Sequence, residues 1–220
     1  MRKKSLEMEG TSVLTVPFKC PLSNCKDIVS PSMILSHFLK EHQRGDDVVD
    51  FKEIQEKEKV SLMFTMTRVV MDLDENICLG ILAYKMKISH QHSNAMVSRE
   101  FQSYEHHLPI FIMTCRGNYV KMYDKGSDFI DPDADFIALW LVSPNVGENQ
   151  KLFVTLTVHN EESTKSLSSL IRVRNASDSQ DVCEFIDIET DFLIVNSGFL
   201  DDIANNGSIF TEIAIAENPL

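Results

Sequence analysis

Two cysteines and two histidines stand close together near the start of this 220-residue chain. Within the segment CPLSNCKDIVSPSMILSHFLKEH, Cys20, Cys25, His37 and His42 have the spacing C-x4-C-x11-H-x4-H. A pair of thiolates on a short loop, followed by two imidazoles on a helix, supplies the four tetrahedral sulfur and nitrogen ligands that Zn²⁺ takes in structural sites. Four ligand types in this order seldom arise by accident. The pattern predicts one structural zinc ion in a unit of residues 17–45.

A short helix must carry both histidines. Ser30 can cap its first turn, and Pro31 fits the first helical position, where no backbone N–H is needed. These signals, with an apolar side along the segment, predict a helix from about 31 to 41. Five residues turn an ideal helix by about 500°, so His37 and His42 would point in different directions. The last turn must therefore tighten or unwind to bring His42 to the metal.

The composition describes a soluble globular protein, with 43% hydrophobic and 25% charged residues. No run of about 18 apolar residues is present, and the opening MRKKSLEMEGTSVL is interrupted by charges, so we expect neither a membrane span nor a secretory signal. The other three cysteines, Cys78, Cys115 and Cys183, are scattered and odd in number, which argues against a disulfide framework. The sequence therefore favours a reducing compartment, the cytoplasm or the nucleus.

The formal net charge is −12, and most of it lies in the second part of the chain. Residues 1–58 hold nine Lys and Arg against ten Asp and Glu, whereas the remainder holds 12 against 23. A protein that holds nucleic acid by its phosphates needs clustered cations, and neither part has a cluster. The charge distribution disfavours nucleic acid as the principal partner.

Beyond residue 58 the hydrophobic pattern takes the two-residue period of half-buried strands. Strands are expected at 62–66, 77–88, 108–115, 118–124, 136–143, 152–158, 167–175, 182–188, 192–196 and 209–215. The segment 136–143, FIALWLVS, is apolar on both faces, as a central strand is. No helical pattern long enough for a parallel crossover intervenes. We expect a flexible tail at 1–16 and an antiparallel β-sandwich at 59–217.

Three stretches together resemble one known family. They are the Cys–His segment with its Cys20-Pro21 opening, the run FIALWLVSPNVGENQKLFVTLTV at 136–158, and the ending DFLIVNSGFLDDIANNGSIFTEIAIAEN at 191–218. They resemble the second zinc finger, the central hairpin and the closing segment of the substrate-binding region of the seven-in-absentia (Siah) ubiquitin ligases. The resemblance covers about residues 20–217. It implies a mainly β fold: a small C2H2-type zinc finger followed by an antiparallel TRAF-like β-sandwich.

The resemblance also implies a protein-interaction module of the ubiquitin pathway. Siah ligases carry a RING domain ahead of two fingers, whereas 19 residues precede Cys20 here, so we expect no ligase activity of the chain by itself. The family's sandwich binds extended peptides along a strand just after the finger. The corresponding segment, 46–58, is expected to be a linker or an edge strand. The candidate peptide-binding residues are Val48, Val49, Phe51 and Ile54. Alternatively, these four side chains simply dock the segment on the sandwich.

Other residues that could do chemistry have simpler interpretations. The histidines in SHQHS (89–93) and EHHL (105–108) could bind a metal or act as bases, but polar loop histidines explain them better. Cys115 could be a nucleophile, but a small buried thiol is the commoner role. The aspartates of segment 124–135 match no defined Ca²⁺ loop and are interpreted as a solvated turn. The sequence shows no catalytic constellation, and we expect no enzyme.

Two functions from different classes remain. The favoured one is a non-enzymatic, zinc-containing protein-interaction module, a peptide-binding adaptor or substrate receptor that can form a homodimer. The alternative is a nucleic-acid-linked regulator whose zinc finger contacts DNA or RNA. A helix that reads bases displays Arg, Lys, Asn or Gln, whereas the polar positions here are Ser32, Ser36, Lys40 and Glu41. The helix therefore favours the first function.

Overall fold

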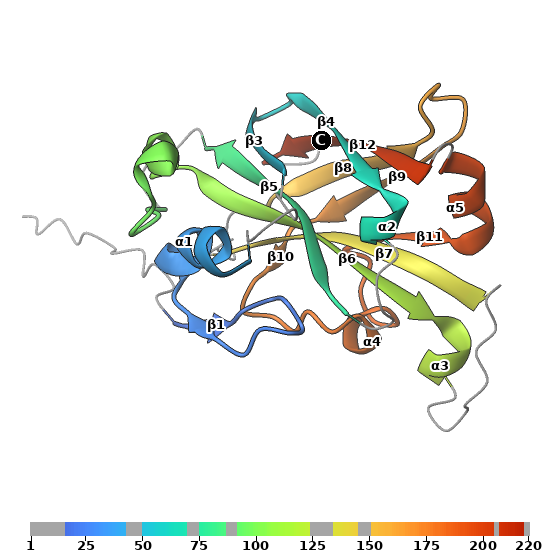
Figure 1. Ribbon diagram of the computed structural model, residues 1–220, viewed down its shortest axis with the longest axis horizontal. Helices are drawn as coiled ribbons and strands as arrows, with labels where there is room; N and C mark the ends of the chain where they lie inside the picture. The colour runs from blue at the N-terminus through green and yellow to red at the C-terminus, as the bar shows by residue number, and fades with distance from the viewer. Residues whose placement is uncertain are drawn as a thin grey trace, which may run out of the picture.

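A computed structural model of the chain describes residues 16–42, 50–69, 75–86, 92–123, 134–144, 151–204 and 207–217. The fold is mainly β, and two sheets pack face to face to form its body (Figure 1). A third layer, built from the segment that carries the cysteines and histidines and from the segment around α4 (Val182–Phe185), lies against the outer face of one sheet. None of the helices in these described segments is long and apolar enough to cross a membrane.

The smaller sheet is antiparallel throughout. Its strands, in spatial order, are β4 (Lys59–Thr65), β12 (Ser208–Ala216), β8 (Phe153–His159) and β9 (Ser166–Arg172). Burial alternates along β4, β8 and β12, so that Leu62, Leu156 and Ile213 point inward while their neighbours face out. This alternation confirms the two-residue period read from the sequence.

The larger sheet has six strands. In spatial order they are β10 (Arg174–Asn175), β7 (Asp135–Ser143), β6 (Leu108–Asn118), β5 (Ile77–Lys85) and β3 (Asp50–Gln55), and β11 (Leu193–Asn196) also pairs with β7. Every residue of β7 is buried, because the smaller sheet covers one face and the third layer covers the other. The prediction of a central strand at 136–143 is confirmed.

Two strand pairs are parallel, so the prediction of a wholly antiparallel fold is wrong at these positions. β3 runs parallel to β5, and β10 runs parallel to β7. A parallel pair needs a connection that returns the chain to its starting end, and a helix usually supplies it. Here strands of the opposite sheet do so, since β4 lies between β3 and β5 in the chain and β8 and β9 lie between β7 and β10.

Two predicted strands are partly or wholly helical instead. Segment 118–124 leaves β6 at Asn118 and forms α3 (Tyr119–Tyr123), because the Asn118 Oδ1 atom accepts a bond from Val120 N at 3.1 Å. In segment 182–188, residues Val182–Phe185 form α4, because Asp181 Oδ1 accepts a bond from Cys183 N at 2.9 Å. Outside residues 16–42, the other helices of the described segments are α2 (Met66–Val69), the 3₁₀ helix η3 (Arg99–Tyr104) and α5 (Ser197–Ile203).

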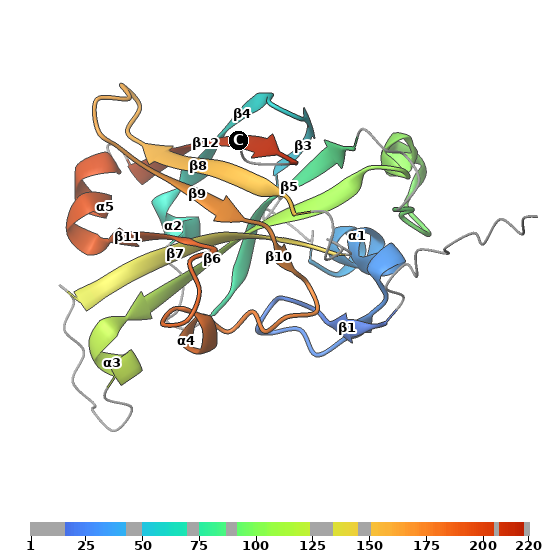
Figure 2. The same cartoon turned by 180° about the vertical axis from the view of Figure 1, so that it is seen from behind.

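The buried apolar residues form two clusters, one on each face of the larger sheet. The first lies between the sheets and consists mostly of Ile, Leu and Val. The second lies on the outer face, where Phe111 and Trp140 of the sheet pack with residues of the N-terminal segment and of α4. Figure 2 shows the fold from behind, with β8 and β9 of the smaller sheet in front. The third layer is thus part of the packed fold.

Gly117 leaves no room for a side chain beside Phe136 of the second cluster. A Cβ atom at this position would lie 2.3 Å from Cζ of Phe136, whose ring is also packed against Tyr119 at a centroid distance of 4.5 Å. Gly117→Ala is therefore expected to lower the free energy of unfolding by about 1–3 kcal/mol, measured by urea denaturation. Gly198→Ala in α5 is the matched control, because the nearest atom would be 3.9 Å away. It should leave stability unchanged or raise it by about 0.5–1 kcal/mol. Equal effects at the two glycines would contradict the contact.

Candidate metal centre

A short hairpin presents the two cysteines. β1 (Phe18–Lys19) pairs with β2 (Ile28–Val29) in antiparallel register. The backbone N–H of Cys20 donates to Asp27 O at 2.9 Å, and that of Cys25 donates to Leu22 O at 3.1 Å. These bonds fold the loop between the strands so that both thiols lie on the same side. We call residues 16–42 the Cys/His unit.

The two histidines lie on a helical segment of changing width. It runs through a 3₁₀ turn, η1 (Pro31–Met33), an α-helical turn, α1 (Ile34–His37), and a π-helical turn, η2 (Phe38–His42). A π turn closes over five residues rather than four, which places His42 over His37. The prediction that the last turn unwinds is confirmed. The capping prediction for Ser30 is wrong: it occupies the N-cap position but makes no side-chain capping bond, and its Oγ lies 3.4 Å from Ser32 Oγ.

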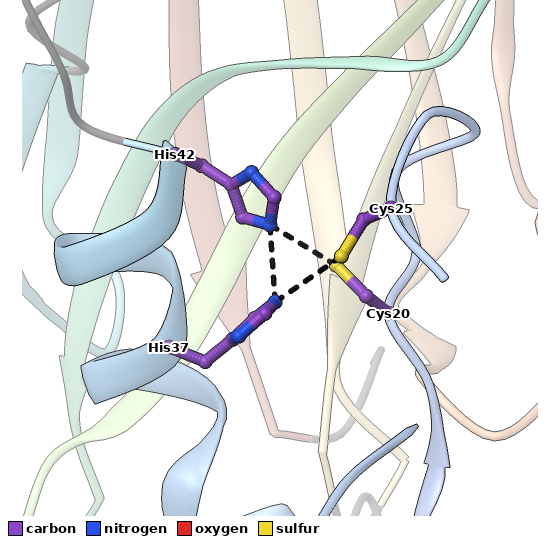
Figure 3. Close-up of side chains that lie close together, drawn as sticks. All are labelled: Cys20, Cys25, His37 and His42. Carbon is purple, nitrogen blue, oxygen red and sulfur yellow. Dashed lines mark hydrogen bonds between the residues drawn. The ribbon is translucent and has the colours of Figure 1, made fainter. Parts of the chain in front are cut away.

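All four predicted ligands converge, with their ligand atoms within 4.8 Å of one another (Figure 3). Cys20 Sγ lies 3.6 Å from His42 Nε2, Cys25 Sγ lies 3.6 Å from His37 Nε2, and the two Nε2 atoms are 3.0 Å apart. In a tetrahedral zinc site, with bonds of about 2.3 Å to sulfur and 2.0–2.1 Å to nitrogen, the sulfur–nitrogen edge is about 3.5 Å and the nitrogen–nitrogen edge about 3.3 Å. The cluster therefore has the size and donor set of a four-coordinate metal site.

The protonation behaviour of the cluster suits metal binding better than nucleophilic catalysis. Burial, with a smaller contribution from the nearby Cys25, raises the pKa of the Cys20 thiol to about 12, whereas a reactive cysteine needs a lowered pKa. Burial lowers the pKa of His37, which keeps its imidazole neutral and able to donate a lone pair. A bound cation takes the place of the thiol protons, so binding releases protons and weakens as the pH falls.

A carboxylate and a set of rings orient the histidines. Asp27 Oδ2 lies 3.8 Å from Nδ1 of His37, which leaves Nε2 facing the cysteines. At this distance the carboxylate attracts the Nδ1 side of the ring without a hydrogen bond, which favours the orientation that turns Nε2 toward the cysteines. The ring of Phe38 packs edge-on against the His42 ring, with centroids 5.2 Å apart. It also packs in a tilted arrangement against Phe111 of β6, with centroids 4.2 Å apart. The ligands are thus connected directly to the outer face of the larger sheet.

Further contacts fix the Cys/His unit to the body. Asn76 donates from its backbone to Ser23 Oγ at 2.8 Å and from its side chain to Gln180 O at 2.7 Å. Ala95 N donates to Ser32 O at 2.7 Å. These bonds connect the unit to Asn76 and Ala95, and Asn76 in turn to the segment after β10.

The sequence profile of one protein family, described as a domain of unknown function (DUF4729), matches residues 19–206. The chain belongs to the DUF4729 family. The match includes all four residues of the metal cluster and ends just before β12. A search of curated proteins finds no match.

Of the four predicted peptide-binding residues, the structure of this DUF4729 chain describes two. Val48 and Val49 lie outside the described residues. Phe51 and Ile54 both lie on β3, but neither is freely exposed: Phe51 packs on Phe101 and Tyr104, at centroid distances of 5.0 and 4.8 Å, and Ile54 is buried between the sheets. The structure therefore gives these two side chains the docking role that was the alternative interpretation.

His92, His107 and Cys115 of the DUF4729 chain take structural positions. His92 is buried and bonded to Asn94 Oδ1 at 2.8 Å, and His107 packs against Tyr104 and lies 3.7 Å from Glu53. Cys115 is buried in the second cluster. His90 and most of the acidic segment 124–135 lie outside the described residues. Within the described part, no second group of potential metal ligands comes together.

Sequence reasoning missed two supports of the metal centre. One is Asp27, whose position two residues after Cys25 offered a weak signal, since carboxylates commonly accompany ligating histidines. The other is the segment after β10. There Gln180 O accepts a hydrogen bond from Asn76 Nδ2, and Gln180 Oε1 accepts one from Trp140 Nε1 at 3.0 Å. Nothing in the local sequence around Gln180 links it to residues so far away in the chain.

Proposed function

We propose that this DUF4729 chain is a non-enzymatic protein-interaction module, in which a zinc-stabilised Cys/His unit and a TRAF-like sandwich hold β3 as a rigid edge for an extended peptide. The observation that carries the proposal is the position of β3. Among the described residues it pairs with β5 alone, and it follows the Cys/His unit in the chain. An exposed strand edge offers unpaired N–H and C=O groups to an incoming strand.

Zinc is the metal that the donor set supports best. Two thiolates and two imidazoles in tetrahedral arrangement are typical of structural zinc, and all four positions are filled by protein, which leaves none open for a reacting water. The site therefore supports a structural role. It acts on β3 only by holding the elements against which β3 packs.

The side chains of β3 divide into anchors and exposed groups. Phe51 and Ile54 fasten the strand from opposite faces, as described above. Lys52 and Glu53 are exposed, and Lys52 Nζ donates to Ser61 O at 2.6 Å. We infer that affinity comes mainly from backbone bonds, with charge pairs at Lys52 and Glu53 selecting among partners. Such shallow recognition suits micromolar binding, corresponding to about −8 kcal/mol.

The cellular role follows from this binding mode. An adaptor or substrate receptor in ubiquitin-linked complexes, in the cytoplasm or nucleus, is the role that the sequence resemblance supports. Contact with nucleic acid has less support, because Lys40 and Glu41, the polar residues at the end of the helical segment, carry opposite charges.

A pair of proline substitutions tests the edge. Successive residues of a strand direct their N–H groups to opposite sides. Of the variants Lys52→Pro and Glu53→Pro, one therefore removes a donor that bonds to β5, and the other removes a donor on the open edge. Peptides selected from a display library of extended peptides are the probe, and amide exchange maps where they bind. We expect protection of residues 50–55. The proline variant that preserves thermal stability should lose binding by at least about tenfold.

Two results would reject this site. One is protection of amides only in parts of the chain other than β3. The other is unchanged peptide affinity in both proline variants, provided that circular dichroism shows each to be folded.

A further inference from the structure

A second strand edge, that of β9, is exposed at the other sheet. β9 pairs with β8 along its whole length, from Ser166 opposite His159 to Arg172 opposite Phe153, without a register shift. Among the described residues it has no strand partner on its other side, and no turn or loop bond involves its backbone. Half of its backbone groups are therefore available for pairing.

The sequence of β9 lacks the features that protect the other long edges, although β11 lies close to it and ion pairs near its ends join it to the segment 191–202. Natural edge strands carry charges, proline, bulges or a cover that discourages pairing. β3 carries Asp50, Lys52 and Glu53, and the edge of β4 receives the Lys52 ammonium at Ser61 O. β9 reads SLSSLIR, with no proline, no bulge and a single charge at its last residue. Leu170 on its outward face is 57% exposed.

The charges around β9 suit a second copy of the chain. With a net charge of −12, two copies repel over most of their surfaces, so a self-association site must lie where negative charge is absent or balanced. β9 contains no carboxylate. Arg172 at its end pairs with Asp191 at 2.7 Å, and Lys165 just before it pairs with Asp202 at 2.7 Å. Two β9 edges can therefore approach without a net electrostatic penalty.

We propose that two copies of the chain associate by antiparallel pairing of their β9 strands about a two-fold axis, which joins the two four-stranded sheets into one of eight strands. A symmetric pair centred on Ser169 places Ser168 opposite Leu170 of the partner subunit, twice per dimer. The seven-residue strand is about 23 Å long, so the contact is smaller than the roughly 800 Å² per partner of a stable interface. The dimer is therefore weak and concentration-dependent. This inference does not depend on the peptide site at β3.

Sedimentation velocity over about a hundredfold range of concentration tests the dimer. The wild-type chain should shift from monomer toward dimer as its concentration rises. Ser168→Lys combined with Leu170→Lys places like charges opposite each other twice, and it should weaken association by at least about tenfold. Ser168→Lys combined with Leu170→Glu places opposite charges there and should retain association. Both positions are exposed, so the variants should fold, as checked by thermal unfolding.

Met63→Lys is the matched control, because Met63 is 54% exposed on the same sheet but lies on β4, at the opposite edge. It should dimerise like the wild type. The proposal is overturned if the wild type stays monomeric at every concentration, if the two double variants associate equally, or if Met63→Lys weakens association as much as the like-charge variant. Library peptides that protect β9 amides on a monomeric chain would likewise reject self-pairing in favour of a different partner.

Discussion

Cys20→Ser will abolish stoichiometric zinc binding and expose the outer face of the larger sheet. The Cys/His unit is too short to form a core of its own, and isolated zinc-finger peptides gain about 10–16 kcal/mol from the ion. This gain is comparable to the whole stability of a typical domain, about 5–15 kcal/mol, so losing even part of it should have a large effect. Because Phe38 of the unit packs on Phe111 of the sheet, loss of the metal also removes that cover.

Three measurements follow this change. Elemental analysis should find one zinc per wild-type chain and less than half an equivalent in Cys20→Ser. The thermal midpoint should fall by well over about 10 °C, since about 1 kcal/mol corresponds to roughly 2–4 °C at this chain length. Emission from Trp140, the single tryptophan and fully buried in the second cluster, should move to longer wavelength. Chelation of zinc from the wild type should reproduce all three effects.

Cys183→Ser is the control for the loss of a thiol as such, because Cys183 is exposed and lies outside the cluster. It should keep one zinc and a wild-type midpoint. A Cys20→Ser protein that retains a full equivalent of zinc, or a chelated protein that unfolds at the wild-type temperature, would show that the cluster is not a structural metal site.

The second large effect is expected at Arg174, whose side chain is 2% exposed. Its guanidinium pairs with Glu189, donates to Ser179 O at 2.8 Å and lies 4.0 Å over the ring of Phe185. These contacts hold the segment that follows β10 in a helical turn over the sheet. Arg174→Ala should lower the free energy of unfolding by about 3–4 kcal/mol, through lost charge-assisted hydrogen bonds and a desolvated cation–π contact.

Arg172→Ala is the matched control, two residues away. The Arg172 side chain is 44% exposed and pairs with Asp191, a type of surface pair that contributes less than about 1 kcal/mol. Urea unfolding should therefore separate the two variants clearly. Arg174→Lys should fall between them, because it keeps the charge but loses the planar fork. If Arg174→Ala and Arg172→Ala have the same stability, the buried guanidinium does not hold the segment.

The metal cluster could be predicted from the sequence because its determinants are local. Cys20 and His42 lie within one short stretch, and the donor chemistry of two thiols and two imidazoles selects the geometry almost without reference to the rest of the chain. The strands of the smaller sheet were also predictable, because one face of the sheet is buried and the other faces solvent, which gives the sequence its two-residue period. Both signals are carried by residues close in sequence.

The errors arise where a capping side chain next to the segment, or a contact with a distant group, decides the local conformation. Segment 182–188 has the apolar content of a strand, but the Asp181 cap and the cation over Phe185 favour a helical turn. The parallel pairing of β3 depends on which sheet receives β4, and no residue of β3 encodes that choice. The packing of Phe51 on η3 depends in the same way on a segment about 50 residues further along the chain.

The place of β12 has a consequence for the synthesis of the chain. This strand is the last one described, yet it lies in the middle of the smaller sheet, with seven paired residues against β4 and seven against β8. During translation, the strand that pairs with both β4 and β8 is missing until β12 has left the ribosome. Both would meanwhile present apolar edges, a state that favours aggregation and chaperone binding. Closure of the smaller sheet therefore waits for β12, whatever order the other strands follow.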